Sequence, residues 1–510
     1  MEPVGNRAPS ELTLDGVVGY WAAHSPEDAA LDCRFGIAET MDWKTFEAAI
    51  GSTAWRLARA VKPGTPIALV CATGTDFHIT VNALWRIGAA VLLLDRNWGP
   101  AIVDDLVRLV GCRTIYAPSN WRSHTNSGAE LLPYPDTSLA SESRRARPSC
   151  NLDATALYAT TSGTTNNPKC VAISHRRIRS AYACCLDVHD FSTVRSCACM
   201  FELNSLGILG ICFLLPREVG AKTIIFPVFS ISTVASTWKA VLESADFVYL
   251  VPPLVRLLNT LPATFASRAP MLGFCSAAPV AEDELRTLEA RFPVRLFNCY
   301  GLTELTFAVF FGCRADDGGA SSSIGFPIGI EARLVGSSGE VIVGPGRGEL
   351  LITGPMLTDG YLNNPTATAE TWQKRCLRTG DLAERDERGA YAIVGRIKDV
   401  VLRGGYTYYL GELEHYLRRA PEVTDVCAFR GRDLPSGDEL CVMVQTHGEV
   451  SSEALLDWIR ENMGANKLPN ALYVSNAALP RNSNGKIDRN MLSSMHLEGV
   501  LREGARHDRS

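Results

Sequence analysis

The sequence predicts an α/β protein. We expect a large N-terminal domain of α/β sheets, which includes a β-rich subdomain, and a small α+β C-terminal domain. The chain has 510 residues, more than one hydrophobic core usually accommodates, so at least two domains are expected. Runs of β-branched residues alternate with helical patterns along most of the chain, which is typical of largely parallel sheets. From about residue 324, short strands with glycine turns replace this pattern.

Strands and helices alternate in the N-terminal part. Residues 67–71 (Ile-Ala-Leu-Val-Cys) and 222–226 (Lys-Thr-Ile-Ile-Phe) have the composition of buried strands. Residues 43–60 and 232–244 have helical patterns, and Ser232 is the candidate N-cap of the second helix. This order of elements indicates strand–helix–strand units.

The C-terminal part begins with glycine-rich turns such as residues 344–348. They predict a β-rich subdomain over about residues 324–397, which completes an N-terminal domain of residues 1–397. A C-terminal domain of residues 398–510 follows, too small to be the main catalytic body. Within it the pattern indicates a helix and then a strand, at residues 412–419 and 424–429.

Composition narrows the function. The net charge of -5 and the absence of a basic stripe argue against a nucleic-acid-binding protein. Residues 89–94 and 206–216 are the longest apolar stretches and are too short to cross a bilayer, so we expect no membrane span. The 16 cysteines show no CxxC spacing and the N-terminus lacks an apolar signal segment, which predicts reduced thiols and a cytoplasmic location.

The most informative segment is residues 160–169, Thr-Thr-Ser-Gly-Thr-Thr-Asn-Asn-Pro-Lys. Apolar and β-branched residues flank it on both sides, so it is expected to form a turn between two strands whose amides and hydroxyls bind phosphate oxygens. It is not a Walker P-loop, because Pro168 precedes the lysine and Cys170 follows it. Taken alone, the segment also fits a hydroxyl-rich hairpin without a ligand.

Five further segments follow in order. They are Ser276-Ala-Ala-Pro279, Asn298-Cys-Tyr-Gly-Leu-Thr-Glu304, Arg378-Thr-Gly-Asp-Leu382, Gly395-Arg-Ile-Lys-Asp399 and Pro480-Arg-Asn-Ser-Asn-Gly-Lys-Ile-Asp-Arg489. With the hydroxyl-rich segment, from about residue 12 to 492, they resemble the adenylate-forming superfamily of acyl-CoA synthetases, nonribosomal adenylation domains and luciferases. The resemblance implies that a carboxylate attacks the α-phosphate of ATP, and that a thiol then displaces AMP. It also implies that the C-terminal domain is a mobile lid.

The resemblance implies these nucleotide-binding roles. The adenine would lie between Tyr300, which precedes Gly301, and an opposite wall, while the amide of Asn298 reads its exocyclic amine. Thr303 would bind the α-phosphate, and Glu304 would hold Mg²⁺ with oxygen ligands. The phosphate-loop residues are Thr161, Ser162, Gly163, Thr164, Thr165 and Lys169, and the opposite wall is Ala277, Ala278 and Pro279.

Further roles fall on the segments after residue 378. Asp381 would accept both ribose hydroxyls, because a carboxylate offers two acceptor oxygens, and Arg396 would bind ribose or phosphate. Lys486 would bridge the substrate carboxylate and the α-phosphate, offsetting the repulsion between two anions. Lys398 falls at the hinge of the lid. The loop that admits the pantetheine of coenzyme A contains Arg403, Gly404 and Gly405.

The acid pocket departs from the family pattern. Asn204 stands where members that act on fatty or aryl acids often have an aromatic residue or histidine, three positions before Gly207, and Glu202 takes the place of an amine-binding aspartate. The apolar residues 203–215 and 305–311, with Leu305, are expected to form the pocket walls. Asn166 and Cys170 stand where many family members have glycine, and Leu410 stands where proline is common.

The expected function is that of an ATP-dependent acyl-CoA synthetase for a carboxylic acid with an apolar body, with ATP, Mg²⁺ and coenzyme A as cofactors or co-substrates. Two alternatives remain open. One is a stand-alone adenylating enzyme that loads an acyl or amino acid onto a carrier protein in trans. The other is a catalytically silent binding protein of the same fold.

Overall fold

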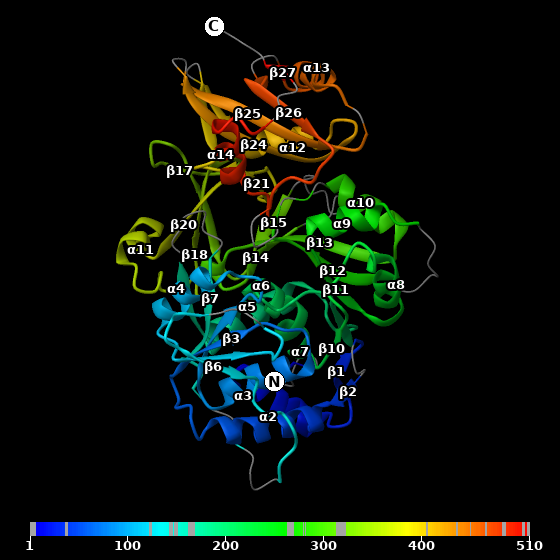
Figure 1. Ribbon diagram of the computed structural model, residues 1–510, viewed down its shortest axis with the longest axis vertical. Coiled ribbons are helices and arrows are strands. Elements are labelled where there is room, and N and C mark those ends of the chain that lie inside the picture. The colour runs from blue at the N-terminus through cyan, green and yellow to red at the C-terminus, as the bar shows by residue number, and fades with distance from the viewer. Residues whose placement is uncertain are drawn as a thin grey trace. The chain divides into compact units, whose positions relative to one another are not determined.

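The computed structural model is α/β, as predicted, with a large N-terminal and a small C-terminal domain. The chain groups into two compact units (Figure 1): unit 1 comprises Met1–Glu331 and Thr353–Leu377, and unit 2 comprises Ala332–Ile352 and Arg378–Ser510. The structure describes residues 7–35, 39–121, 125–141, 146, 151–161, 169–262, 270–278, 280, 282–312, 323–403, 406–434, 437–448, 450–464, 467–481, 486–501 and 505–506.

The first sheet of unit 1 has the strand order β6-β5-β3-β4-β7-β8. All neighbouring strands are parallel except β7 and β8, which pair antiparallel. Its apolar strands are buried, as a sheet covered by helices requires. The strands are β3 (Pro66–Val70), β4 (Ala90–Leu94), β5 (Thr114–Ala117), β6 (Glu130–Pro133), β7 (Thr155–Thr160) and β8 (Cys170–Ser174).

The second sheet of unit 1 has the order β15-β14-β13-β12-β11-β9-β10-β1-β2. Its centre, from β13 to β1, is parallel, and its ends are antiparallel. The strands are β1 (Ala29–Cys33), β2 (Glu39–Asp42), β9 (Ser196–Cys199), β10 (Lys222–Ile225), β11 (Phe247–Leu250), β12 (Met271–Cys275), β13 (Val294–Gly301), β14 (Ala308–Phe311) and β15 (Ser323–Pro327).

Helices of unit 1 connect and cover these strands, and α2 packs beside α3 (Figure 1). They are α1 (Gly16–His24), α2 (Trp43–Leu57), α3 (Thr75–Arg86), α4 (Pro100–Val110), α5 (His175–Val188), α6 (Leu206–Leu209), η2 (Gly210–Leu214), α7 (Leu215–Arg217), α8 (Val234–Ser244), α9 (Pro252–Asn259), α10 (Glu282–Arg291) and η3 (Thr303–Leu305). The segment at 353–377 adds α11 (Pro365–Thr371) and β19 (Trp372–Gln373).

Side-chain caps explain where two of these helices begin. The Asp42 carboxylate accepts the backbone N–H of Thr45 at the start of α2, and the Ser174 hydroxyl caps α5 in the same way. The expectation that Ser232 caps α8 was wrong. That helix begins at Val234, with Thr233 as its N-cap and no side-chain cap bond, because the Ser232 hydroxyl bonds to Ser230 instead.

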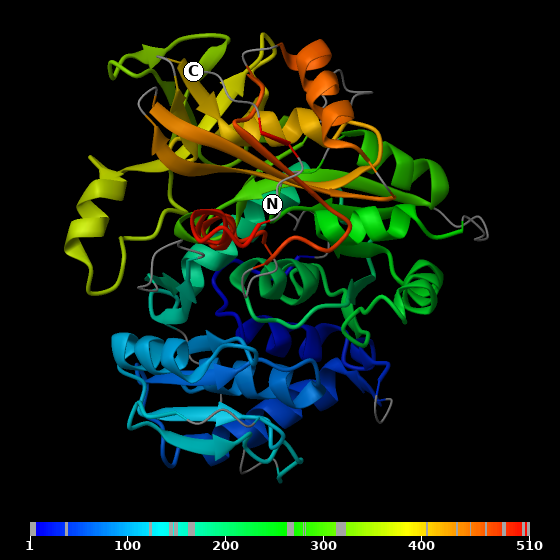
Figure 2. The ribbon, with the colours of Figure 1, turned by 45° about the horizontal axis from the view of Figure 1, so that its top comes forward.

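Unit 2 contains two sheets. One has the order β17-β16-β18-β20-β21, and the other has the order β23-β22-β25-β26-β27, with β24 paired to β25. Figure 2 shows the long strands of the second sheet in orange. The first is built from β16 (Glu331–Val335), β17 (Val341–Ile342), β18 (Gly346–Thr353), β20 (Cys376–Arg385) and β21 (Tyr391–Arg396). The second is built from β22 (Val400–Arg403), β23 (Tyr406–Tyr409), β24 (Val423–Leu434), β25 (Gly437–Thr446), β26 (Ala471–Ser475) and β27 (Ala505–Arg506).

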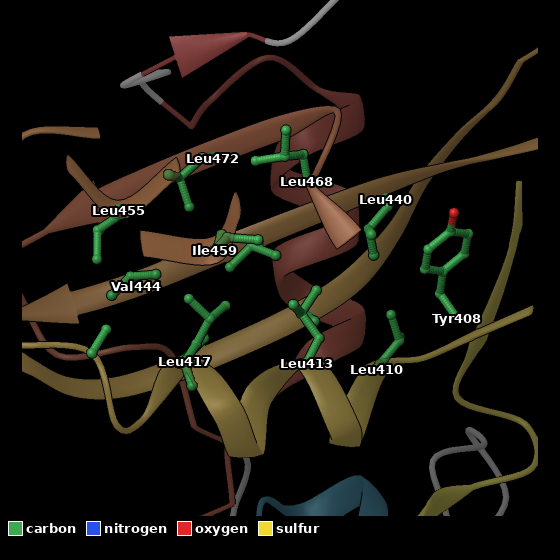
Figure 3. Packing of buried hydrophobic residues seen from close by; sticks show 14 of the residues in the cluster. Tyr408, Leu410, Leu413, Leu417, Leu440, Val444, Leu455, Ile459, Leu468 and Leu472 are labelled. Carbon is green, nitrogen blue, oxygen red and sulfur yellow. The ribbon is translucent and has the colours of Figure 1, made fainter. Parts of the chain in front are cut away.

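The helices in the described part of unit 2 are α12 (Leu410–Leu417), α13 (Ser452–Met463) and α14 (Arg489–Leu497). Leu413 of α12 and Ile459 of α13 contribute to one apolar core with the strands, and Leu440 and Val444 of β25 lie in the same core (Figure 3). Leu410, which stands where the family often has proline, is 2% exposed and belongs to this core too.

The predicted domain boundary at residues 397 and 398 stays a prediction. Packing alone groups the strands of residues 332–352 and 378–397 with the C-terminal sheet, whereas the predicted boundary marks where a lid would pivot. Among the described residues, no helix is long and apolar enough to cross a membrane, and the cysteines there form no disulfide.

Truncation of the unit 2 core should destabilise that unit. Ile459 is 0% exposed, so we expect Ile459→Ala to lower its unfolding free energy by about 2–4 kcal/mol, through lost burial and the cavity left behind. Native-state hydrogen exchange of the amides in β24 and β25 measures this change. Leu402→Ala is the matched control, since Leu402 is 55% exposed. It should change the unfolding free energy measured by hydrogen exchange by at most about 0.5 kcal/mol. Equal effects would contradict the proposed core.

Candidate functional site

The carboxyl ends of β12 and β13 lie side by side in unit 1. The two strands are parallel, with Cys275 opposite Asn298, so the residues after β12 reach the same sheet edge as the end of β13. Open α/β sheets bind ligands at this kind of edge. Ala277 and Ala278 are exposed there, and Ala277 has φ of 79°, in the left-handed region. Pro279, the third predicted member of this wall, lies outside the described residues.

Tyr300 stands near the end of β13. Its half-buried ring lies edge-on to Phe310 of β14, with ring centroids 5.7 Å apart. The Asn298 amide donates to the carbonyl of Ser323 at 3.3 Å, which fixes its orientation. A Cβ at Gly301 would lie 2.4 Å from the Phe307 carbonyl oxygen, so only glycine allows these two segments of the chain to approach each other here.

The predicted turn between two strands is confirmed at its base. Thr160 of β7 pairs with Cys170 of β8, and the Thr161 N–H donates to the Lys169 carbonyl at 2.9 Å. Cys170 is buried, and this burial raises the pKa of its thiol to about 12. Among the predicted phosphate-loop residues, Ser162, Gly163, Thr164 and Thr165, together with Asn166, lie outside the described residues.

The Thr303-Glu304 segment lies against this base. Thr303 begins the short helix η3, and its hydroxyl points to the carbonyl of Thr160 at 3.5 Å. The carbonyl of Glu304 accepts the N–H of Thr358 at 2.9 Å. Residues that are far apart in sequence therefore meet beside the loop.

Tyr361 connects the two candidate phosphate-site residues. Its hydroxyl donates to Glu304 Oε1 at 2.6 Å, and Lys169 Nζ lies 4.7 Å from the centroid of its ring. The aromatic face attracts the ammonium, and the hydroxyl orients the carboxylate. Lys169 and Glu304 are therefore held by opposite parts of one side chain.

Sequence reasoning did not identify Tyr361. A tyrosine that follows Gly360 is a weak signal, because glycine–aromatic pairs occur in many turns. Its importance comes from a distant pairing: Tyr361 forms an antiparallel bridge with Val171, and the Leu362 N–H donates to the Cys170 carbonyl at 2.7 Å. Local sequence does not encode that partner.

The predicted acid-pocket residues include a polar pair. The Asn204 amide donates to Asp95 Oδ2 at 2.7 Å, and Asp95 is 3% exposed directly after β4. Glu202 forms a 3.4 Å ion pair with Arg96. Burial raises the pKa of Glu202, Arg96 opposes this, and the negative charge of Asp95 adds to it. Asp95 and Arg96 were not among the residues predicted from sequence.

Asn204 also lines a small cavity of about 20 Å³, room for about one water molecule. Of the other predicted pocket residues, Gly207 is exposed, with no atom within 4 Å of the position that a Cβ would take, and Leu305 is fully buried. Neither lines this cavity, and their substrate roles stay predictions. The cavity is lined by Leu93, Leu157, Tyr158, Ala159, Thr160, Asn204, Ser205 and Leu206.

In unit 2, Asp381 and Arg396 face each other across β20 and β21. Arg396 Nε lies 2.6 Å from Asp381 Oδ1, with the carboxylate 3% exposed and the guanidinium 52% exposed. Gly380 has φ of 67°, and its carbonyl accepts the N–H of Ile397. This conformation within β20 sets the carboxylate beside its partner.

Lys486 lies close enough to this pair to sense both charges. Although its side chain reaches the surface, loss of solvation lowers the pKa of Lys486; Arg396 lowers it further, and Asp381 opposes both. An antiparallel bridge between Arg481 and Ile487 closes the chain around this lysine. The three residues predicted for ribose and phosphate chemistry are therefore grouped within unit 2.

Arg489 fastens the chain that follows Lys486. Its guanidinium contacts the carboxylates of Asp399 and Glu414, with 2.7 Å to Glu414 Oε1, and donates to the Ala428 carbonyl at 2.8 Å. Asp399 directly follows Lys398, which is exposed in the turn between β21 and β22. The hinge role of Lys398 stays a prediction.

Arg403 is engaged inside its own unit. Its Nη1 donates to the Leu468 carbonyl at 2.8 Å and to Asn470 Oδ1 at 2.9 Å. Gly404 and Gly405 lie outside the described residues. The predicted contact of this loop with coenzyme A therefore stays a prediction.

Comparison with known proteins decides the family. The family described as AMP-binding enzyme matches residues 19–362, and its C-terminal domain, the AMP-binding enzyme C-terminal domain, matches residues 412–486. The chain belongs to the AMP-binding enzyme family. This confirms the predicted membership of the adenylate-forming superfamily.

Similar proteins include CoA ligases. A probable CoA ligase of Humulus lupulus is 28% identical over 68% of this chain and 66% of its own length. A feruloyl-CoA synthase of Amycolatopsis sp is 27% identical over 84% of this chain and 88% of its own length. Among solved structures, ATP-bound MatB from Rhodopseudomonas palustris has a TM-score of 0.84 at 19% identity, covering 96% of this chain and 99% of that chain. That likeness establishes the fold.

The Tyr361 hydroxyl should matter for nucleotide binding in this AMP-binding enzyme. Tyr361→Phe keeps a ring for Lys169 but releases Glu304, so we expect ATP binding in the presence of Mg²⁺ to weaken about tenfold, the value of roughly one hydrogen bond. Calorimetry with and without Mg²⁺ measures this. Tyr134→Phe, which also removes a hydroxyl hydrogen bond in unit 1, should bind ATP as the wild type does. An unchanged affinity in Tyr361→Phe contradicts the role.

Proposed function

We propose that the protein is an ATP-dependent acyl-CoA synthetase. It would join a carboxylic acid to AMP with release of pyrophosphate, and then transfer the acyl group to coenzyme A with release of AMP. The CoA ligases among its relatives support the reaction class. The observation that carries the proposal is the meeting of Lys169 and Glu304 at Tyr361, because it gathers a cation and a carboxylate beside a hydroxyl-rich loop.

The first set of residues would hold the nucleotide. Tyr300 offers a flat face for adenine, and Asn298 an amide group beside it. Lys169, with the loop after Thr161, would bind the leaving phosphates. Glu304 fits Mg²⁺ because its carboxylate is oriented by Tyr361 and hard cations take oxygen ligands. When bound, the ion would neutralise charge on the phosphates.

The second set would assist the reacting groups. Asp381 would accept the ribose hydroxyls, and Arg396 would bind ribose or phosphate. Lys486 would lie between the incoming carboxylate and the α-phosphate, where a positive charge reduces the repulsion of the two anions. Because displacement at phosphorus needs positioning and charge stabilisation, no protein nucleophile is required.

The proposed acid has an apolar body. The apolar residues 203–215 and 305–311 support this proposal, and the Asn204 amide is held by Asp95. A second carboxylate, Glu202, lies close enough to Asp95 for their charges to interact. Such a surface disfavours a second carboxylate on the substrate. Thioester formation from a panel of monocarboxylic and dicarboxylic acids tests this. A cytoplasmic location stays a prediction.

Loading of a carrier protein in trans is the second candidate within the superfamily. Incubation with ATP, candidate acids, and either coenzyme A or a holo-carrier protein separates the two. Thioester on the carrier alone would reject the CoA assignment. A silent binding protein is disfavoured by the presence of Thr303, Glu304, Asp381, Arg396 and Lys486, and the absence of acid-dependent exchange between pyrophosphate and ATP across a broad acid panel would favour it.

Lys486→Ala should separate the two half-reactions. We expect acid-dependent pyrophosphate exchange to fall at least about a hundredfold, since one well-placed donor is worth that much at a developing charge. Thioester formation from a supplied acyl-adenylate should stay largely intact. Lys239→Ala, which removes an exposed lysine of α8, should leave both steps unchanged. Equal loss of both steps in Lys486→Ala would contradict the assignment.

Adenylation should also depend on the charge around Lys486. The protonated amine is the active form, and its pKa is lowered, so activity should fall with rising pH earlier than for an ordinary lysine. Arg396→Gln removes a cation that lowers this pKa, so the alkaline limb should move to higher pH, whatever the change in rate. The pH profile of pyrophosphate exchange measures this. Arg388→Gln, in the exposed turn after β20, should leave the limb in place.

A further inference from the structure

Three side chains with metal-binding chemistry converge in the interior of unit 2. Glu439 and Cys441 are two residues apart on β25, so they face the same side of the sheet. His496 of α14 packs on that side. Its Nε2 lies 2.8 Å from Glu439 Oε2 and 3.7 Å from Cys441 Sγ, and all three ligand atoms lie within 4.8 Å of one another. None is more than 6% exposed.

A glycine on the neighbouring strand allows these atoms to pack close to the backbone of β24. A Cβ at Gly431 of β24 would lie 2.6 Å from Glu439 Oε2, 2.7 Å from Cys441 Sγ and 2.9 Å from His496 Nε2. Gly431 is absent from the residues with positive φ in the described chain, so space, and not backbone conformation, requires glycine here. A side chain at this position would push the oxygen, sulfur and nitrogen atoms apart.

The surroundings orient two of these ligands. The Tyr473 hydroxyl lies 2.5 Å from Nδ1 of His496, and the backbone N–H of Arg432 donates to Glu439 Oε2 at 2.9 Å. A partner on the second ring nitrogen fixes a histidine ligand and its tautomer. This arrangement is therefore more than a chance cluster of acidic groups.

We propose that Glu439, Cys441 and His496 form a binding site for Zn²⁺ or a similar borderline divalent cation. Thiolate, imidazole and carboxylate together suit Zn²⁺ and do not suit Mg²⁺ or Ca²⁺, which prefer oxygen ligands alone. The second carboxylate oxygen or a water molecule would complete a tetrahedral site. The ion would tie β25 to α14, and the proposal does not rest on the proposed enzymatic function.

Binding has a defined proton balance. Without metal, the His496 ring donates from Nε2 to Glu439 and accepts at Nδ1 from Tyr473. With metal, the Nε2 lone pair binds the cation, and the ring proton moves to Nδ1, where the Tyr473 oxygen accepts it. The Cys441 thiol loses its proton to solvent, so one proton is released for each ion bound.

The test uses the full-length protein after treatment with a chelator. Titration with Co²⁺ should give one equivalent of tight binding with thiolate-to-metal charge-transfer absorption, and Zn²⁺ should displace it with release of no further proton. Cys441→Ser should lose this absorption and the tight equivalent. Cys427→Ser, which changes another buried cysteine of the same apolar cluster, is the matched control and should retain both.

Two further variants keep the proposal testable if Cys441→Ser does not fold. Glu439→Gln should weaken Zn²⁺ binding at least tenfold, and Gly431→Ala should abolish it because its Cβ would displace the three ligand atoms. Zn²⁺ should raise the Tm of the wild type and leave the Tm of folded Gly431→Ala unchanged, with folding checked by circular dichroism. Equal binding by the wild type and by folded variants of Gly431 and Cys441 would overturn the site, and so would the absence of any binding. Tyr473, His496 and Glu439 would then form a hydrogen-bonded chain without a metal ion.

Discussion

The hydrogen bond from Tyr361 to Glu304 is the interaction on which the proposed nucleotide-binding residues of unit 1 depend. It is short, at 2.6 Å, and it joins the turn after β13 to a segment that pairs with β8 through Val171. The Lys169 ammonium lies over the same ring, 4.7 Å from its centroid. The backbone carbonyl of Glu304 also accepts a hydrogen bond from the Thr358 N–H. The positions of both residues in the bond are therefore fixed. A cation and a carboxylate thus keep a fixed separation before any ligand arrives.

The candidate residues of unit 2 are organised by charge. Asp381 forms an ion pair with Arg396, and the charges of both residues shift the pKa of Lys486. Arg489 binds two carboxylates in the same unit. The Asp381 carboxylate is 3% exposed, and removing the partner of a buried charge is costly, so these pairs favour a single arrangement of the chain around Lys486. Stability and the proposed chemistry therefore depend on the same arginines.

Local chemistry explains what the sequence could predict. The residues of the loop base, and the strands on either side of it, follow from a run of small hydroxyl residues between apolar runs, and the strand pairing of Thr160 with Cys170 agrees. Tyr361, Asp95 and Arg96 were missed because their partners are distant in sequence. Ser232 failed as a cap because a neighbouring hydroxyl competes for it. Propensity describes one segment at a time, whereas these contacts depend on tertiary structure.

The backbone of Ala277 has a consequence for variation in this chain. Its φ of 79° is open to glycine and asparagine but strained for β-branched or bulky residues. Exposed positions ordinarily tolerate many substitutions, yet here the main chain restricts the choice while the surface does not. Substitutions among homologues at this sheet edge should therefore occur mainly at the neighbours of Ala277. The backbone conformation of this exposed segment should be retained when those neighbours change.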